Sequence, residues 1–216
     1  MELTLIQKIA VFALPVIFAI TLHEAAHGYV ARYFGDMTAA AAGRITLNPL
    51  KHIDPVGTIL VPAITLMLGG FLFGWAKPVP VNFAALRHPK KDMLWVAAAG
   101  PGANLLMAIF WGFVIFLSQL VPPNFFTTPL VLMGQAGIFI NAVLMVLNLI
   151  PLPPLDGGRI AVSLLPRAQA IMLSRIEPYG FFILLGLLIT GLLGRLLLPL
   201  VYSVISVVGA IFGFQG

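Results

Sequence analysis

The chain contains 216 residues, of which 60% are hydrophobic and only 9% are charged. Soluble domains carry about 25% charged residues, so this composition excludes an ordinary soluble domain and indicates an integral membrane protein. The formal net charge of +5 does not predict a nucleic-acid partner, because the basic residues lie in loops beside apolar segments, where the positive-inside rule places them. There is no cysteine, so any metal ion must be held by His, Asp or Glu side chains.

Six apolar segments follow one another along the chain: roughly 4–34, 56–75, 93–121, 131–150 continuing to about 165, 179–194 and 196–214. Stretches of about 20 apolar residues can span a bilayer as helices. We therefore predict an all-α, polytopic membrane protein with about five to six membrane segments. The absence of repeats and polar linkers predicts a single membrane-embedded domain over 1–216, with a core at about 4–165 and C-terminal helices at about 179–214.

The charges beside these segments predict how they cross the membrane. Basic residues follow segment 4–34, precede segment 93–121 and follow segment 131–165, and basic ends are expected on the cytoplasmic side. The first segment and 131–165 then run in the same direction. Four full crossings in sequence would make them antiparallel, so we predict that 56–75 is re-entrant.

The connection at 74–91 contains the sequence Val-Pro-Val-Asn at 79–82. Alternation around prolines predicts extended backbone and not helix. Extended chain at membrane depth is tolerated only where it is buried in protein or lines a cavity. We therefore predict a short extended element near an active site, although a proline-rich loop explains the pattern nearly as well.

The end of the first segment places His23, Glu24 and His27 within an apolar run. The two histidines are four residues apart and therefore share one face of a helix, where two imidazoles can hold one zinc ion. Glu24 can reach a water molecule beside the metal, and His-Glu-x-x-His is a signature of zinc metalloproteases. A chance match is the alternative, but ionisable groups in a spanning segment are costly and mark function. We predict His23 and His27 as zinc ligands and Glu24 as the catalytic base.

Asp156 is the best candidate for the third protein ligand that a catalytic zinc site usually has. It lies in the sequence NLIPLPPLDGGRI at 148–160, where prolines break the apolar segment 131–165. Broken helices are characteristic of binding sites in membrane proteins. The predicted topology places Asp156 towards the same membrane face as the two histidines. A helix N-cap is the alternative role, and the two roles can coexist.

Other polar residues fit structural roles better. Asp36 lies in a Gly-Asp turn that we expect to be solvated, and Asp54, in His-Ile-Asp-Pro, fits a helix N-cap. We expect His52, in a connector, at the surface and not as a fourth ligand. Arg159 lies three residues after Asp156, where it could orient the carboxylate or reach the membrane interface.

Three blocks of the sequence resemble the site-2 protease family of intramembrane zinc metalloproteases, peptidase family M50, in its small form without PDZ or CBS domains. The blocks are HEAAHGY at 23–29, GPGAN at 100–104 and NLIPLPPLDGGRI at 148–160. The resemblance implies a substrate that is itself a membrane-spanning protein, cut within or near the bilayer. Because the connectors look like those of small bacterial and archaeal members, it also implies the cell membrane of a bacterium or archaeon. The charge pattern alone predicts that the active site lies towards the cytoplasmic side.

The resemblance further implies roles for particular residues. It implies zinc held by His23, His27 and Asp156, with Glu24 as the catalytic base. Asn148 matches the asparagine of the family's N-x-x-P-x-P stretch, and its amide could bind an extended peptide or a developing oxyanion.

Two further asparagines allow more than one interpretation. Asn104 follows the Gly-Pro-Gly at 100–102, whose glycines allow close packing onto the helix that carries the histidines. We consider Asn104 for substrate or oxyanion binding, with an interhelical hydrogen bond as the alternative. Asn141 has the same ambiguity and no motif.

The sequence thus predicts an intramembrane zinc metalloprotease that acts on membrane-spanning protein substrates in the lipid bilayer. A catalytically silent adaptor that binds membrane helices and a metal transporter are the alternatives, because broken helices with ionisable residues also occur in transport sites. The absence of a repeat and the presence of Glu24, which a carrier would not need, argue against a transporter.

Overall fold

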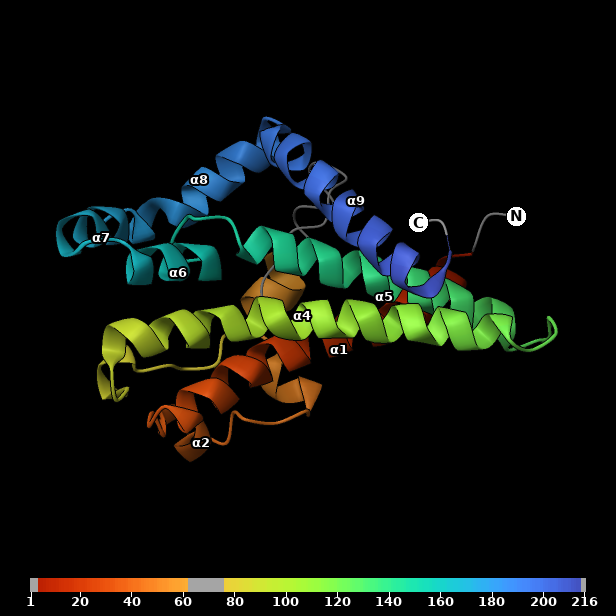
Figure 1. Cartoon of the computed structure of the whole chain (residues 1–216), viewed down its shortest axis with the longest axis horizontal. Helices are drawn as coiled ribbons and strands as arrows, with labels where there is room; N and C mark the ends of the chain where they lie inside the picture. The colour runs from red at the N-terminus through yellow and green to blue at the C-terminus, as the bar shows by residue number, and fades with distance from the viewer. Residues whose placement is uncertain (1–3, 62–75, 215–216) are drawn as a thin grey trace.

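The computed structural model of the protein describes residues 4–61 and 76–214 (Figure 1). Within these ranges the secondary structure is helical and contains no strand, which confirms the predicted fold class. Most of the predicted segment 56–75 lies outside the described residues. Its re-entrant path therefore stays a prediction.

Among the described residues, four helices are long and apolar enough to cross a membrane. These are α1 (Leu5–Tyr33), α4 (Pro89–Gln119), α5 (Thr127–Asn148) and α9 (Leu192–Phe212). Each coincides with one of the predicted apolar segments. Thr4 begins α1 with a capping box, in which its hydroxyl accepts from the Gln7 N–H while the Gln7 side chain accepts from the Thr4 N–H.

Three shorter helices lie between α5 and α9: α6 (Asp156–Leu164), α7 (Arg167–Ser174) and α8 (Glu177–Ile189). The break between α5 and α6 falls at the predicted proline stretch. Helix α7 was not predicted. Helices α7 and α8 together pass the length and hydropathy test for a span but are bent by 61°, so the described residues provide four to five candidate spans.

Helices α1 and α5 run in the same direction, and α4 runs antiparallel to both (Figure 1). This confirms the relative direction that the charge pattern predicts for the first segment and 131–165. As a result, the C-terminal part of α1 and the chain that follows α5 meet at one end of the bundle. The contact between His27 and Asp156 lies at this junction.

Close packing of α4 against α5 forms the centre of the bundle. Trp111 and Ile115 of α4 are buried and lie against two glycines of α5, Gly134 and Gly137. A Cβ atom at Gly137 would overlap the Trp111 ring. Small residues let membrane helices approach closely, because apolar burial against lipid contributes little to their association. The two glycines therefore allow α4 to lie directly against α5.

Short elements lie between α1 and α4 in the chain: α2 (Thr38–Ala41), η1 (Pro49–His52), η2 (Pro55–Leu60) and η3 (Phe83–Ala85). Of these, α2 and η1 contact α1, and η3 contacts α4. Asp54 caps η2 by accepting from the N–H groups of Val56 and Gly57, which confirms its predicted role. The segment 76–82 is neither helix nor strand. It is therefore non-helical, as predicted, but in the described part of the chain no strand pairs with it.

Two expectations about surface residues are wrong. Asp36 is fully buried, and its carboxylate accepts from the Thr38 N–H and hydroxyl and from the Asn82 N–H at 2.7 Å. These bonds tie the turn after α1 to the segment 76–82. His52 is also buried, with its Nε2 3.1 Å from the carbonyl oxygen of Thr46. Asp36 is bound by Asn82, which is distant in sequence, and His52 lies in η1, which packs against α1. The local sequence around each residue does not reveal these contacts.

Replacing Asp36 tests this connection. Burial raises the pKa of the Asp36 carboxyl, but the hydrogen bonds from Thr38 and Asn82 lower it by more, so the pKa lies below its ordinary value. A lowered pKa stabilises the folded state above the ordinary Asp pKa of about 3.9, and this contribution is lost as pH falls through the folded-state pKa. Asp36→Asn should destabilise the protein by about 1–3 kcal/mol at pH 7. The difference in unfolding temperature from the unmodified protein should shrink below about pH 4. The role would be contradicted if Asp36→Asn lowered the unfolding temperature equally at pH 7 and below pH 4. It would also be contradicted if the exposed control Glu177→Gln lowered the unfolding temperature as much as Asp36→Asn does.

Candidate metal centre

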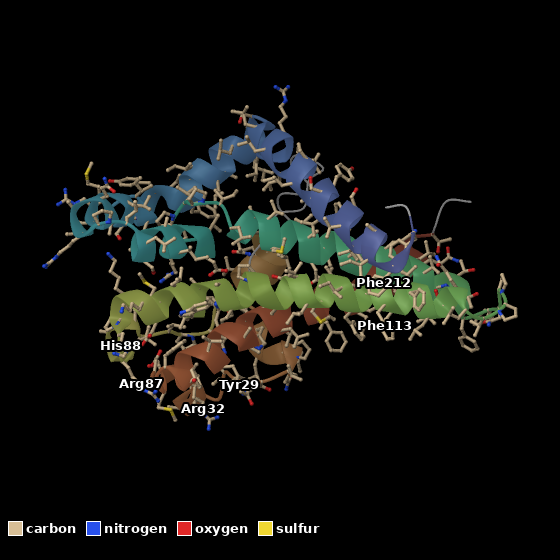
Figure 2. All side chains as sticks on the ribbon, viewed as in Figure 1. Tyr29, Arg32, Arg87, His88, Phe113 and Phe212 are labelled. Atoms are coloured by element: carbon tan, nitrogen blue, oxygen red, sulfur yellow. The ribbon has the colours of Figure 1, made fainter. Side chains whose placement is uncertain are left out.

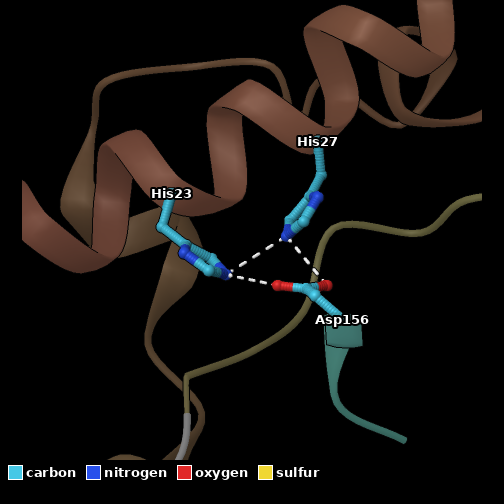
Figure 3. Close-up of side chains that lie close together, drawn as sticks. All are labelled: His23, His27 and Asp156. Carbon is cyan, nitrogen blue, oxygen red and sulfur yellow. Dashed lines mark hydrogen bonds and ion pairs between the residues drawn. The ribbon is translucent and has the colours of Figure 1, made fainter. Parts of the chain in front are cut away.

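His23 and His27 lie one turn apart on α1 and turn their rings towards Asp156 (Figure 3). The two Nε2 atoms are 3.1 Å apart. The Asp156 oxygens lie 3.3 Å from His23 Nε2 and 3.4 Å from His27 Nε2. All three residues are at least nine-tenths buried, and their ligand atoms lie within 4.8 Å of one another. The structure thus joins the three residues that the sequence nominates as metal ligands.

The hydrogen-bond partner of Nδ1 determines which ring nitrogen of each histidine carries the proton. His23 Nδ1 lies 2.6 Å from Asn104 Oδ1, and His27 Nδ1 lies 2.7 Å from the carbonyl oxygen of Val96. Asn104 is oriented because its Nδ2 donates to the Ala19 carbonyl and to Asn141 Oδ1. Since both Nδ1 partners are acceptors, each neutral imidazole carries its proton on Nδ1 and a lone pair on Nε2.

This donor set fits a metal ion. The two Nε2 lone pairs face each other and the Asp156 carboxylate. In addition, Asp156 Oδ2 is buried without a hydrogen-bond donor. Electron pairs held this close repel one another unless a cation lies among them. Two imidazoles and one carboxylate are ligands that zinc accepts, and three protein ligands leave a coordination position open.

The proline loop between α5 and α6 positions Asp156. Asp156 is the first residue of α6, which has no side-chain N-cap hydrogen bond, so the alternative N-cap role is not adopted. A Cβ atom at Gly157 or Gly158 would overlap the backbone of residues 149–153. The Gly-Gly pair therefore allows the loop to fold tightly against the start of α6, directly beside the carboxylate.

Helix α8 packs onto the same loop. A Cβ atom at Gly180 would overlap the carbonyl oxygen of Pro153 and lie 2.6 Å from Pro154 Cδ. Helix α8 follows the core predicted at about 4–165 in the sequence, yet it contacts the loop that carries Asp156.

Glu24 lies beside the metal centre but faces the segment 76–82. Its Oε2 accepts a hydrogen bond from the Val79 N–H at 2.7 Å. Glu24 and the three metal-centre residues line a cavity of about 290 Å³, together with Asn148 and Arg159. The cavity therefore brings a carboxylate that can exchange protons and a side-chain amide to the same space as the metal centre.

The asparagines divide into two groups. Asn104 and Asn141 are fully buried, and Asn141 Nδ2 donates to the Gly137 carbonyl. Their bonds connect α1, α4 and α5, which favours the interhelical role over an oxyanion role for Asn104. Asn148 donates to the Leu144 carbonyl at 2.9 Å and also lines the cavity, so it stays a candidate for substrate binding.

Arg159 contacts neither oxygen of Asp156 among the described interactions. Its guanidinium lies 3.3 Å from Glu177 Oε1 and 4.8 Å from the centre of the Phe83 ring. His52 is likewise not part of the metal cluster found among the described residues.

Two contributors to the site were not predicted individually. Gly100 lies directly against the imidazoles, since a Cβ atom there would lie 2.6 Å from His23 Nε2 and would overlap His27 Nε2. Val79 contributes its backbone N–H to Glu24. For Gly100 a signal existed, because the Gly-Pro-Gly sequence indicated close packing onto the helix that carries the histidines. For Val79 there was none, because any residue except proline could provide the backbone N–H.

The fold and the site together define a polytopic helical membrane protein with a buried His-His-Asp cluster that could hold a metal ion, beside a glutamate. Residues 124–191 match the family described as "Peptidase family M50". The chain is 40% identical over 206 residues to "Putative zinc metalloprotease YwhC" of Bacillus subtilis (strain 168), covering 92% of this chain and 91% of the relative. The chain therefore belongs to peptidase family M50.

Two mycobacterial proteins named "Putative zinc metalloprotease Rip2" are also similar. The protein from Mycolicibacterium smegmatis (strain ATCC 700084 / mc(2)155) is 34% identical over 206 residues, covering 91% of this chain and 74% of the relative. The protein from Mycobacterium tuberculosis (strain ATCC 25618 / H37Rv) is 29% identical over 143 residues, covering 64% of this chain and 51% of the relative. No solved structure gives a significant match.

The contact at Gly100 predicts a metal-binding defect. Gly100→Ala places a methyl group where the two imidazoles meet and should lower zinc affinity roughly 10–100-fold, as displaced supporting groups do in other metal sites. Gly102→Ala is the matched control, because Gly102 lies on the same helix and a Cβ atom there meets nothing within 4 Å. Zinc titration of both purified variants measures the difference. Equal affinities would contradict the steric account.

The contact at Gly180 predicts that α8 supports Asp156. Gly180→Ala should force α8 and the proline loop apart, destabilise the fold by about 1–3 kcal/mol and lower zinc affinity. Gly186→Ala on the same helix meets open space and should leave both properties unchanged. Thermal unfolding and zinc titration of the two variants provide the comparison, and indistinguishable variants would refute the support by α8.

Proposed function

We propose that the protein is an intramembrane zinc metalloendopeptidase that hydrolyses peptide bonds in or near the transmembrane segments of membrane-protein substrates. The observation that carries the proposal is the meeting of His23, His27 and Asp156 in one cavity with Glu24. Membership of family M50 and the zinc metalloprotease names of the relatives support the same activity.

In the proposed site, His23, His27 and Asp156 hold the zinc ion. A bound zinc ion supplies Lewis-acid chemistry, polarising a peptide carbonyl and lowering the pKa of a water molecule. Asn104 and the Val96 carbonyl hold the histidine rings in the orientation that presents both Nε2 atoms.

Glu24 acts as the proton carrier in this proposal. It takes a proton from the attacking water and delivers it to the leaving amine. The Val79 N–H, 2.7 Å from Glu24 Oε2, orients the carboxylate and leaves its other oxygen to exchange the proton. Glu24 is only partly buried, so water can reach it from the cavity.

A helical substrate hides its scissile carbonyl in i→i−4 hydrogen bonds and must unwind locally before cleavage. The non-helical segment 76–82 and Asn148 line the same cavity as the metal-centre residues. An unwound substrate strand could pair with this segment through main-chain hydrogen bonds, and Asn148 could hold its carbonyl.

We further propose that the site faces the cytoplasmic side of a cell membrane. Arg32, Arg87 and His88 lie at the end of the bundle towards which α1 and α5 run, whereas Phe113 and Phe212 lie towards the other end (Figure 2). The basic end is expected in the cytoplasm. Because the metal centre lies past the midpoint of α1 towards that end, water would reach it from the cytoplasmic side.

Cleavage of a single-span model substrate in proteoliposomes tests the function. Glu24→Gln should lower the turnover rate by at least about 10²-fold. Zinc should stay bound, because the three ligands are unchanged. Lys91→Gln, which removes an exposed charge outside the cavity, should cleave normally. Undiminished turnover by Glu24→Gln would overturn the assignment of the base.

Zinc content separates the alternatives. A metal-free adaptor would purify without zinc. In a zinc enzyme His23→Ala should lose the ion, whereas the exposed control His88→Ala should retain it. A protein that binds zinc with the full donor set yet cleaves no membrane-spanning substrate would favour a transporter.

A further inference from the structure

A second cavity, of about 690 Å³, lies between the start of α4, η3, α6 and α7. We propose that this cavity binds an anionic phospholipid, with an acyl chain against its apolar wall and the phosphate at its basic rim. The proposal concerns a site separate from the metal centre and does not depend on the proposed proteolysis.

The charge of the rim fits an anion. Lys90, Arg167 and Arg175 line the cavity, and no carboxylate lines it. Among the described residues, none of the three has an acidic side chain within ion-pair distance. The Lys90 ammonium donates to the Leu165 carbonyl at 2.6 Å, which holds the ammonium at the cavity while two of its three donors stay available.

The walls fit an acyl chain. Met93, Val162 and Ile171 supply apolar surface from three different helices. An acyl chain packs against such side chains and needs no hydrogen-bond partner.

The depth of the cavity fits a headgroup. Lys90 is the second residue of α4, where the chain enters the membrane. Helix α7 has eight residues and is about 12 Å long, too short to span a bilayer. Its Ile171 and Met172 are 47% and 68% exposed, which suits a helix at the interface. Basic pockets between membrane helices on the cytoplasmic side bind anionic headgroups.

The cavity also adjoins the metal-centre cavity. The Phe83 ring lines both, and the Arg159 guanidinium lies over it. A lipid in the larger cavity would therefore border the wall of the smaller one.

Lipid titration of the purified full-length chain, followed by native mass spectrometry, tests the site. Phosphatidylglycerol and phosphatidylcholine with identical acyl chains are compared in about 0.5 M salt, where exposed charges are largely screened. The unmodified protein should prefer phosphatidylglycerol. Arg167→Gln/Arg175→Gln should lower that affinity roughly 30-fold, about fivefold per cation, and leave phosphatidylcholine binding unchanged.

The controls separate the cavity from general surface charge. Arg32→Gln/Lys51→Gln removes the same charge from exposed positions outside the cavity and should keep the preference. Arg167→Lys/Arg175→Lys should retain most of it. Glycerol phosphate without acyl chains should not displace the lipid. Equal binding of the two lipids, equal losses in both charge-removing variants, or displacement by glycerol phosphate or an acidic peptide would overturn the proposal.

A measurement without any substitution covers the case in which the variants fail to fold. Photoreactive phosphatidylglycerol added to the unmodified protein should crosslink to the elements that line the cavity, which are η3, the start of α4, α6 and α7. Crosslinks confined to other helices would refute the site.

Discussion

The arrangement of the site depends on one electrostatic constraint: two imidazole lone pairs and a carboxylate face one another in a buried position. When both imidazoles are neutral, the acceptors on each Nδ1, Asn104 Oδ1 and the Val96 carbonyl, place the protons on Nδ1 and leave a lone pair on each Nε2. Without a cation this cluster is repulsive, and because the three residues are at least nine-tenths buried, water screens the repulsion only weakly. A metal ion bound by these residues would therefore stabilise the junction of α1, α4 and α6.

Glycines and prolines make this junction sterically possible. Gly100 lets α4 lie directly against the two imidazoles, and Gly157, Gly158 and Gly180 let the proline loop fold between α6 and α8. Each of these positions excludes a Cβ atom because another part of the chain occupies that space. The third ligand is consequently fixed by helices on both sides of it, although it lies about 130 residues after the histidines.

Much of the site could be predicted because its signals are local. The spacing of His23 and His27 places them on one helix face wherever the helix lies. The prolines before Asp156 reveal a broken helix within an apolar segment. The long helices could be predicted from hydropathy, and the parallel direction of α1 and α5 from flanking charge. Both properties of the sequence are set by the membrane environment and do not depend on how the helices pack.

The errors concern residues whose environment is set by distant chain. Asp36 and His52 look like loop residues, yet each is buried by packing that no short window of sequence records. The interhelical bonds of Asn104 and the hydrogen bond from Val79 to Glu24 depend in the same way on tertiary contacts. Helix α7 has eight residues and is too short for a hydropathy pattern of spanning length to reveal it.

X-ray absorption spectroscopy of the purified, zinc-loaded protein tests the central claim most directly, because it reads the atoms bound to the ion. We predict one zinc ion per chain with two imidazole nitrogens at about 2.0–2.1 Å and carboxylate or water oxygens at about 2.0–2.2 Å. Asp156→Ala should change the oxygen shell while leaving the imidazole signal. A shell with three imidazoles, or one that is unaffected by loss of Asp156, would contradict the account.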